Sequence, residues 1–222
     1  MTKQERGIRS RRAILEAAAE VFDLRGYDAA GTNEILSRTG LTRGALYHHF
    51  PSKEAIALAV LEAHGDGLAL PERSPQASRL QSVIDLCFAF ADRLHTDAVL
   101  RAAVRLAVEQ TSLPRPGDTP YEQSRAVVRT LLAEAADQGE TLPGLDLDEA
   151  ADVIIAAFTG VRVMSQVYTA RADLPERLTA LWRMLLPGIA NPGMIGRLRT
   201  TPPPTAADGD AASATSARTT SA

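Results

Sequence analysis

The sequence predicts an all-α protein with a small N-terminal helix-turn-helix unit and a larger C-terminal helical unit. Apolar residues recur three and four positions apart along most of the chain, which is the spacing of one helix face, and no run alternates convincingly with a period of two. Glycine and proline gather in short segments that separate these runs. With 222 residues, 45% of them apolar, the chain can form one large core or two small ones.

The first two helices are indicated by apolar stripes. One runs from Ser10 to Gly26, and the second begins near Thr32. A short third helix follows and completes a three-helix unit. We expect Tyr27 and Phe50 to pack in the core of this unit rather than to contact a ligand.

The stretch from Thr39 to Glu54, TGLTRGALYHHFPSKE, is the most informative part of the chain. Gly40 can take the positive φ that closes one helix, and the side-chain oxygen of Thr42 can cap the next. Pro51 ends that next helix because it cannot donate to the helical ladder and disfavours helical geometry at the residue before it. The result is a helix-turn-helix whose second helix is too short to be a core element.

The side chains on this short helix suit the major groove of DNA. The guanidinium of Arg43 can donate two hydrogen bonds to a guanine edge, and the rings of Tyr47 and His48 can reach phosphates or bases. Gly44 and Ala45 are small enough to let the helix approach closely. We therefore interpret it as a DNA recognition helix.

The N-terminus is locally basic although the whole chain carries a net charge of −3. Five basic residues face one acid, Glu5, in the first twelve positions, for a local charge of about +4 (five minus one): Lys3, Arg6, Arg9, Arg11 and Arg12. Such an arm is attracted to phosphate, and we expect Arg9 to contact DNA. A merely solvated terminus is the alternative.

The helix-turn-helix resembles the recognition segment of the TetR family of one-component bacterial regulators. That pattern is Thr-x-Gly-x-x-Tyr-x-His-Phe followed by a small residue and Lys, and it is filled here by Thr42, Gly44, Tyr47, His49, Phe50 and Lys53. The resemblance implies a homodimeric, ligand-responsive repressor that binds double-stranded operator DNA. Thr42, Tyr47 and Lys53 would then contact phosphates, while His49 would either contact DNA or pack to orient the helix.

A fourth helix is expected from Lys53 to His64, with Lys53 in its first turn, where the helix dipole already favours an anion such as phosphate. The predicted organisation is a DNA-binding domain over residues 1–52, a connecting helix and loop over 53–75, and a ligand-binding and dimerisation domain over 76–199. Residues 200–222 are rich in Thr, Pro, Ala and Ser and predict a disordered tail.

Every element predicted in the C-terminal unit is a helix. Apolar stripes indicate helices over residues 77–95 and 97–110, and a third is expected from Pro120, at its first position, to Gly139. Two more follow, which Asp146 and Asp173 introduce. A capping box of Asp146 with Glu149 opens the longest apolar helix, which extends to about Tyr168.

The order of these helices is similar to the γ-butyrolactone-receptor branch of the TetR family, which implies a cavity for a small hydrophobic effector. The residues expected to line it are His64, Ile84, Phe88, Ser124, Val127, Leu131, Ala157 and Phe158. By default, any one of them is more often structural. Ser124 stands where hormone-binding members carry a tryptophan, and Ala157 stands where some carry a hydroxyl. These departures favour a bulkier ligand, such as an antibiotic or its precursor, as in the pseudo-receptors of the branch.

The last two long helices are apolar over more than one stripe, so packing within one subunit would leave apolar surface exposed. A four-helix seam between two subunits would cover it, and a two-fold dimer predicts a pseudo-palindromic operator. The residues expected in this interface are Val161, Met164, Leu181, Trp182 and Leu185.

No metal site, cofactor or membrane association is predicted. His48 and His49 are adjacent, so on a helix they point about 100° apart and cannot chelate one metal. The start of the chain lacks the apolar region of a signal peptide, and Arg162 interrupts the most hydrophobic run. Since Cys87 is the only cysteine, no intramolecular disulfide can form, and we expect a cytoplasmic protein.

The alternative from another functional class is an all-helical enzyme that acts on a hydrophobic metabolite and whose helix-turn-helix is incidental. The sequence contains no G-x-S-x-G, P-loop, dinucleotide-binding or H-E-x-x-H motif. No nucleophile can be assigned a base. The sequence therefore favours a DNA-binding repressor over an enzyme.

Overall fold

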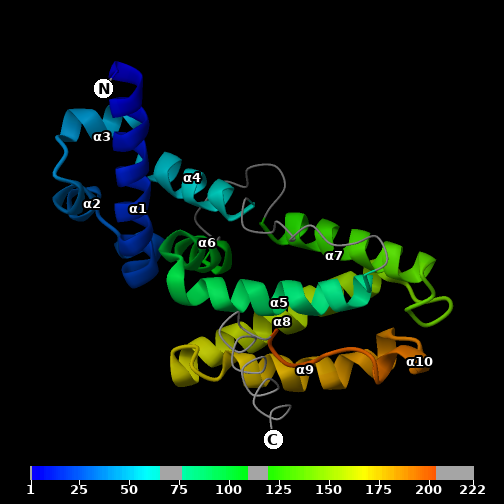
Figure 1. The fold of residues 1–222 in the computed structure, drawn as a ribbon. Helices are drawn as coiled ribbons and strands as arrows, with labels where there is room; N and C mark the ends of the chain where they lie inside the picture. The colour runs from blue at the N-terminus through cyan, green and yellow to red at the C-terminus, as the bar shows by residue number, and fades with distance from the viewer. Residues whose placement is uncertain (1, 66–76, 110–119, 204–222) are drawn as a thin grey trace, which may run out of the picture.

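The computed structural model describes residues 2–65, 77–109 and 120–203, and the elements within these ranges are helices (Figure 1). They are α1 (Lys3–Ala29), α2 (Thr32–Thr39), α3 (Arg43–His49), α4 (Lys53–Gly65), α5 (Arg79–Thr96), α6 (Ala98–Val108), α7 (Pro120–Asp137), α8 (Leu147–Thr169), α9 (Leu174–Ile189) and α10 (Pro192–Ile195). One isolated β-bridge joins Thr141 to Ala190. The all-α prediction is confirmed, and only the short α10 was not expected.

Two hydrophobic cores divide these helices, and α6 contributes to both. The first core packs α1, α2, α3 and α4 together and includes Ala103 and Leu106 of α6. The second packs α5, α7, α8 and α9 and includes Leu100 and Val104 of α6. In Figure 1, α6 lies beside the C-terminal end of α1, between the two groups of helices. A displacement of α6 would therefore disturb both cores.

The first helix is longer than the sequence predicted, because it begins at Lys3 rather than Ser10. The Thr2 hydroxyl accepts from the Glu5 N–H at 3.3 Å, and a Glu5 carboxylate oxygen accepts from the Thr2 N–H at 2.8 Å. This capping box starts the helix early. The expectation of a separate basic arm is therefore wrong, and Arg9 is an exposed residue of α1 itself.

The predicted helix ends at Gly26 and Gly40 are marked by positive φ. Gly26 has φ 74° and breaks α1 about a turn before its last residue, while Gly40 has φ 65° and closes α2. Asp146 caps α8 by accepting from the N–H groups of Asp148 and Glu149, both at 3.0 Å. In the part of the chain that the structure describes, the Glu149 side chain does not return a bond to Asp146, so only half of the predicted capping box forms.

The C-terminal segment docks on α5 before the predicted tail begins. Arg199 forms an ion pair with Asp85 at 2.7 Å, and its backbone N–H donates to the Gln81 side chain at 2.7 Å. The Gln81 amide in turn donates to the Arg199 carbonyl at 3.0 Å. Most of the tail predicted to be disordered, residues 204–222, lies outside the described residues.

Candidate DNA interface and ligand pocket

Helix α3 is fixed to the first core by one buried side chain and is capped as the sequence predicted. The Thr42 hydroxyl accepts from the Ala45 N–H at 3.2 Å, which starts the helix. Leu46 is fully buried, and Phe50, directly after the helix, is 3% exposed. Since α3 spans only Arg43–His49, this anchoring leaves the rest of its surface outside the core.

The exposed face of α3 carries the polar residues proposed for DNA contact. Arg43, Gly44, Tyr47 and His48 are exposed, and His49 is half-buried. The Arg43 guanidinium lies 5.7 Å from the centre of the Tyr47 ring. Hydrogen bonds from Thr32 and then from Arg43 lower the pKa of the Tyr47 phenol. These contacts hold the Arg43 and Tyr47 side chains together on the surface without burying them.

Lys53 makes contacts within the protein that the sequence did not predict. Its ammonium donates to the carbonyl oxygens of Tyr27 at 2.8 Å, Ala30 at 3.2 Å and Asp28 at 3.4 Å, and it lies 4.4 Å from the centre of the Tyr27 ring. These carbonyls belong to the C-terminal end of α1, where the helix dipole is negative. The ammonium thus caps the end of α1 in this structure, and the phosphate contact expected of Lys53 stays a prediction.

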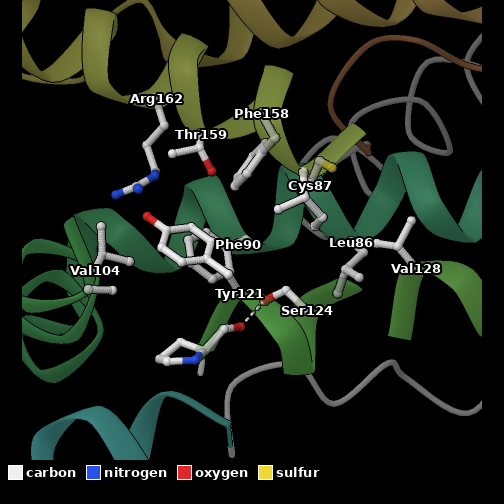
Figure 2. A pocket seen from close by; sticks show the side chains of 13 residues that line it. Leu86, Cys87, Phe90, Val104, Tyr121, Ser124, Val128, Phe158, Thr159 and Arg162 are labelled. Atoms are coloured by element: carbon white, nitrogen blue, oxygen red, sulfur yellow. Dashed lines mark hydrogen bonds between the residues drawn. The ribbon is translucent and has the colours of Figure 1, made fainter. Parts of the chain in front are cut away.

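An apolar pocket lies between α5, α6, α7 and α8 (Figure 2). It contains about 590 Å³ of empty space, its open mouth included. From α5 and α6 it is lined by Leu86, Cys87, Phe90, Val104 and Ala107. From α7 and α8 it is lined by Pro120, Tyr121, Ser124, Val128, Ile155, Phe158, Thr159 and Arg162. This pocket lies among the helices on which the cavity was expected.

Individual pocket residues were predicted less well. Ser124 and Phe158 line the pocket as expected. Ile84, Phe88 and Leu131 are instead buried in the second core, and Val127 and Ala157 are partly buried outside the pocket lining. The side chain of His64 lies outside the described residues.

The errors have a common cause. A shift of one residue turns a side chain by about 100° around a helix, so a prediction that finds the right helix can still choose the wrong face. Cys87 faces the pocket where Phe88 was expected, and Val128 does so where Val127 was expected. The missed residue with the most distinctive chemistry is Arg162, whose only sequence signal was a lone charge within an apolar helix.

The polar groups that line the pocket differ in their hydrogen bonds and in how burial changes their pKa. The Ser124 hydroxyl donates to the Pro120 carbonyl at 2.8 Å, and burial raises the pKa of the Cys87 thiol to about 12. Arg162 is only 6% exposed. Burial, and secondarily repulsion from Arg171, lower the pKa of the Arg162 guanidinium, whereas the electrostatic effect of Tyr121 favours its charged form. Figure 2 shows the Arg162, Tyr121 and Thr159 side chains at the same end of the pocket.

Helices α8 and α9 carry an exposed apolar surface, which we call the α8–α9 face. It includes Val153 at 46%, Met164 at 48%, Val167 at 72%, Tyr168 at 70% and Met184 at 80%. The predicted interface residues Val161, Leu181 and Leu185 are half-buried.

Trp182 must be removed from the predicted interface. It is fully buried in the second core of its own subunit. Leu178, Trp182 and Leu186 form the inner stripe of α9 at four-residue spacing, which is the period of one helix face. The outer stripe of α9 is therefore the one available to a second subunit, and it carries Met184.

Comparison with known proteins gives matches along nearly the whole chain. The family model "Bacterial regulatory proteins, tetR family" matches residues 14–60, and "Tetracyclin repressor-like, C-terminal domain" matches residues 77–191. The A-factor receptor protein of Streptomyces griseus is 38% identical over 199 residues, which cover 90% of this chain and 70% of the receptor.

Two solved structures extend this similarity to the fold. One, described as the molecular basis for control of antibiotic production by bacterial hormones, has a TM-score of 0.76 and 34% identity, and the match covers 83% of this chain and 99% of that chain. The other is the TetR family protein CprB from Streptomyces coelicolor in complex with its biological operator sequence. Its TM-score is 0.71 and its identity 31%, over 85% of this chain and 93% of that chain.

Proposed function

Because the chain belongs to the TetR family of transcriptional regulators, we propose that it is a homodimeric repressor that a small hydrophobic effector releases from a pseudo-palindromic operator. Its relatives are DNA-binding regulators rather than enzymes, which argues against the enzyme alternative. The similarity of this chain to the A-factor receptor protein and to a structure concerned with antibiotic production supports the proposal that it regulates genes of secondary metabolism.

The observation that carries the proposal is the exposed surface of α3. Arg43 is the candidate for direct readout, as a bidentate donor to a guanine, and His48 is a weaker candidate for a base or phosphate. Thr42 and Tyr47 would fix the register on phosphates, with Gly44 allowing close approach. The basic residues near the start of α1, Arg9 among them, would add further phosphate contacts to those made from α3.

The α8–α9 face supports dimer formation. Exposed apolar side chains on two adjacent helices are what a second copy of the same face can cover, and such an isologous contact has two-fold symmetry. By length and composition alone, α8 could also cross a membrane. However, its C-terminal half carries the buried Arg162 and Ser165, and its inner side packs on α7 and α9. Its exposed apolar surface is therefore better explained by a contact between the subunits of a cytoplasmic dimer.

Helix α6 gives the effector a route to the DNA-binding unit. Val104 and Ala107 line the pocket, while Ala103 and Leu106 pack in the first core. Two charged contacts tie the same helix to α1: Arg101 pairs with Asp23 at 2.7 Å, and Glu109 accepts from the Tyr27 N–H at 2.9 Å.

An effector that binds better when α6 is displaced would favour the DNA-free state, because a ligand shifts an equilibrium by its difference in affinity for the two states. The short side chain of Ser124 on the pocket wall supports the notion of a bulky effector, such as an antibiotic or a precursor, over a small lactone.

The test is selection of binding sites from a pool of random DNA duplexes by the full-length protein. We expect a pseudo-palindromic consensus that binds one or more dimers, with an affinity that falls as the salt concentration rises, since each phosphate contact releases counterions. A pool that yields no consensus, together with turnover of a bound metabolite, would overturn the proposal in favour of an enzyme.

A further inference from the structure

We propose that the effector carries a carboxylate or a comparable anionic group that pairs with Arg162 at the polar end of the pocket. This inference rests on the proposed function, because it concerns the chemistry of the ligand that would occupy the same pocket. Its basis is that the side chains of Arg162, Tyr121 and Thr159 lie together at one end of a pocket whose other walls are mainly apolar (Figure 2).

Arg162 is a buried cation that forms no ion pair with a carboxylate among residues 2–65, 77–109 and 120–203. Its side chain lines the pocket, with the residue only 6% exposed, and the group that favours its charged form is the side chain of Tyr121. By comparison, Arg101 on α6 forms an ion pair with Asp23, with 2.7 Å between the guanidinium nitrogen and the carboxylate oxygen. Burial of a charge is costly unless a counter-charge accompanies it. An anion from the ligand would supply that counter-charge, in the two-pronged geometry that a guanidinium offers to a carboxylate.

Thr159 provides a second donor beside Arg162. Elsewhere in this unit, helical threonine hydroxyls donate to the carbonyl four residues earlier, as Thr130 does at 2.9 Å, Thr169 at 3.0 Å and Thr179 at 2.9 Å. The Thr159 hydroxyl makes no such bond, and it has no other hydrogen-bond partner in the described part of the chain. It is therefore available to a ligand oxygen, and the Tyr121 hydroxyl lies at the same end of the pocket (Figure 2).

The rest of the lining requires an apolar body. Leu86, Phe90, Val104, Ile155 and Phe158 supply hydrocarbon surface, and the Ser124 hydroxyl is already bound to a backbone carbonyl. The Cys87 thiol stays protonated because burial raises its pKa to about 12. A ligand with polar groups at one end and hydrocarbon at the other fits this distribution, whereas a neutral lactone would leave the Arg162 charge unbalanced.

Arg162 also borders a groove between α1, α6 and α8. An anion bound to Arg162 would therefore also act on the charges that line this groove. Three more arginines line this groove, Arg101, Arg105 and Arg171, against two acids, Asp23 and Glu109. The repulsion between Arg171 and Arg162 is part of this excess of positive charge. An anion paired with Arg162 would reduce this repulsion. It would do so where α6 meets α1, next to the hydrogen bonds that join these two helices.

The test compares two probes that differ only in charge, 4-butylbenzoate and its neutral amide, 4-butylbenzamide. Calorimetric titration of the full-length protein at pH 7.5 should show the benzoate binding at least about tenfold more tightly, which corresponds to about 1.4 kcal/mol. In Arg162→Gln this preference should disappear while binding of the amide is retained. Thr159→Val and Tyr121→Phe should each reduce the preference several-fold.

Two further variants keep the test decisive. Arg129→Gln, an exposed position on α7 outside the pocket, should leave the preference unchanged. Arg162→Lys, which retains charge without the planar fork, should keep part of the preference and covers the case in which Arg162→Gln fails to fold. Equal binding of the two probes, binding of neither, or a preference that survives in Arg162→Gln would overturn the inference. If operator selection still yields a pseudo-palindrome, the repressor proposal stands even so; if that selection fails as well, the proposed function is wrong.

Discussion

Replacement of Lys53 by methionine separates the role that the structure gives this residue from the role that the sequence suggested. Methionine keeps an unbranched side chain of similar length but removes the ammonium. The three carbonyls of Tyr27, Asp28 and Ala30 then lose their shared donor at the end of α1. Since the residue is half-buried, water can replace only part of this contact.

The size of the effect follows from these contacts. The carbonyls at 2.8 and 3.2 Å are within ordinary hydrogen-bond distance, whereas the one at 3.4 Å is at the limit. A hydrogen bond to a charged group contributes about 1.5–3 kcal/mol, and a cation at a helix C-terminus or over an aromatic ring adds about 0.5–1 kcal/mol. Because these contributions overlap, we expect Lys53→Met to lower the free energy of unfolding by about 2–3 kcal/mol. The melting temperature of a chain of this size should fall by about 4–12 °C.

The assay combines urea denaturation with the salt dependence of operator binding. Arg25→Met is the matched control, because Arg25 is an exposed cation of α1 whose side chain is 60% accessible and whose ion pair with Glu34 is long, at 3.8 Å. That change should alter stability by no more than about 0.5–1 kcal/mol. The reasoning would be refuted if Lys53→Met left the unfolding free energy intact and lowered the magnitude of the salt slope by about one, which is the signature of a lost phosphate contact.

Three other predictions concern the pocket, the α8–α9 connection and the dimer. Ser124→Trp should fill the pocket and exclude an apolar dye while leaving melting temperature and operator affinity nearly unchanged; a loss of about 1–3 kcal/mol of stability would instead show a solid core at this position. Hydrogen bonds from Ser165, Thr169 and Arg177 lower the pKa of Asp173 to about 2, so the stability it provides is complete above about pH 4 and is lost as the pH falls through 2. Acid titration of Asp173→Asn should accordingly show a stability difference from the parent that shrinks over this range, and a difference independent of pH would contradict it. Met184→Glu should dissociate the dimer in sedimentation experiments, whereas Ile195→Glu, on α10, should leave it intact; a dimer that persists in Met184→Glu would place the subunit contact elsewhere.

The helix-turn-helix could be predicted from the sequence because its determinants are local. Gly40 takes the positive φ that closes α2, and Thr42 caps α3 within the same short stretch. Leu46 and Phe50 then fix the helix to the core. Each of these features depends on residues a few positions apart, so a single sequence is enough to read them.

The role of Lys53 could not be found in this way. Its partners lie 23 to 26 positions earlier in the chain, and only the packing of α4 against α1 brings them together. The sequence showed a lysine in the first turn of a helix, which suits an anion from solvent as well as carbonyl groups from the protein. Nothing local distinguishes the two.

The C-terminal unit shows the same limit at the level of helix faces. Trp182 and Met184 are both apolar, but only the packing of α9 determines that the first is fully buried and the second is 80% exposed. For the same reason, Cys87 lines the pocket where Phe88 was expected to do so. Arg162 was visible only as an interruption of an apolar run, and its meaning depends on its burial without an ion-pair partner among the described residues, which is a property of the folded chain.

The central claim, that α3 reads operator sequence, is tested most directly by the base preference of Arg43→Ala on the selected operator. We expect affinity to fall by about 1–3 kcal/mol and the preference to relax at one base position in each half-site, as loss of a bidentate contact to guanine does. Arg197→Ala, an exposed residue beyond α10, provides the control and should change neither quantity. An Arg43→Ala protein with the base preference of the parent at every position would contradict the account.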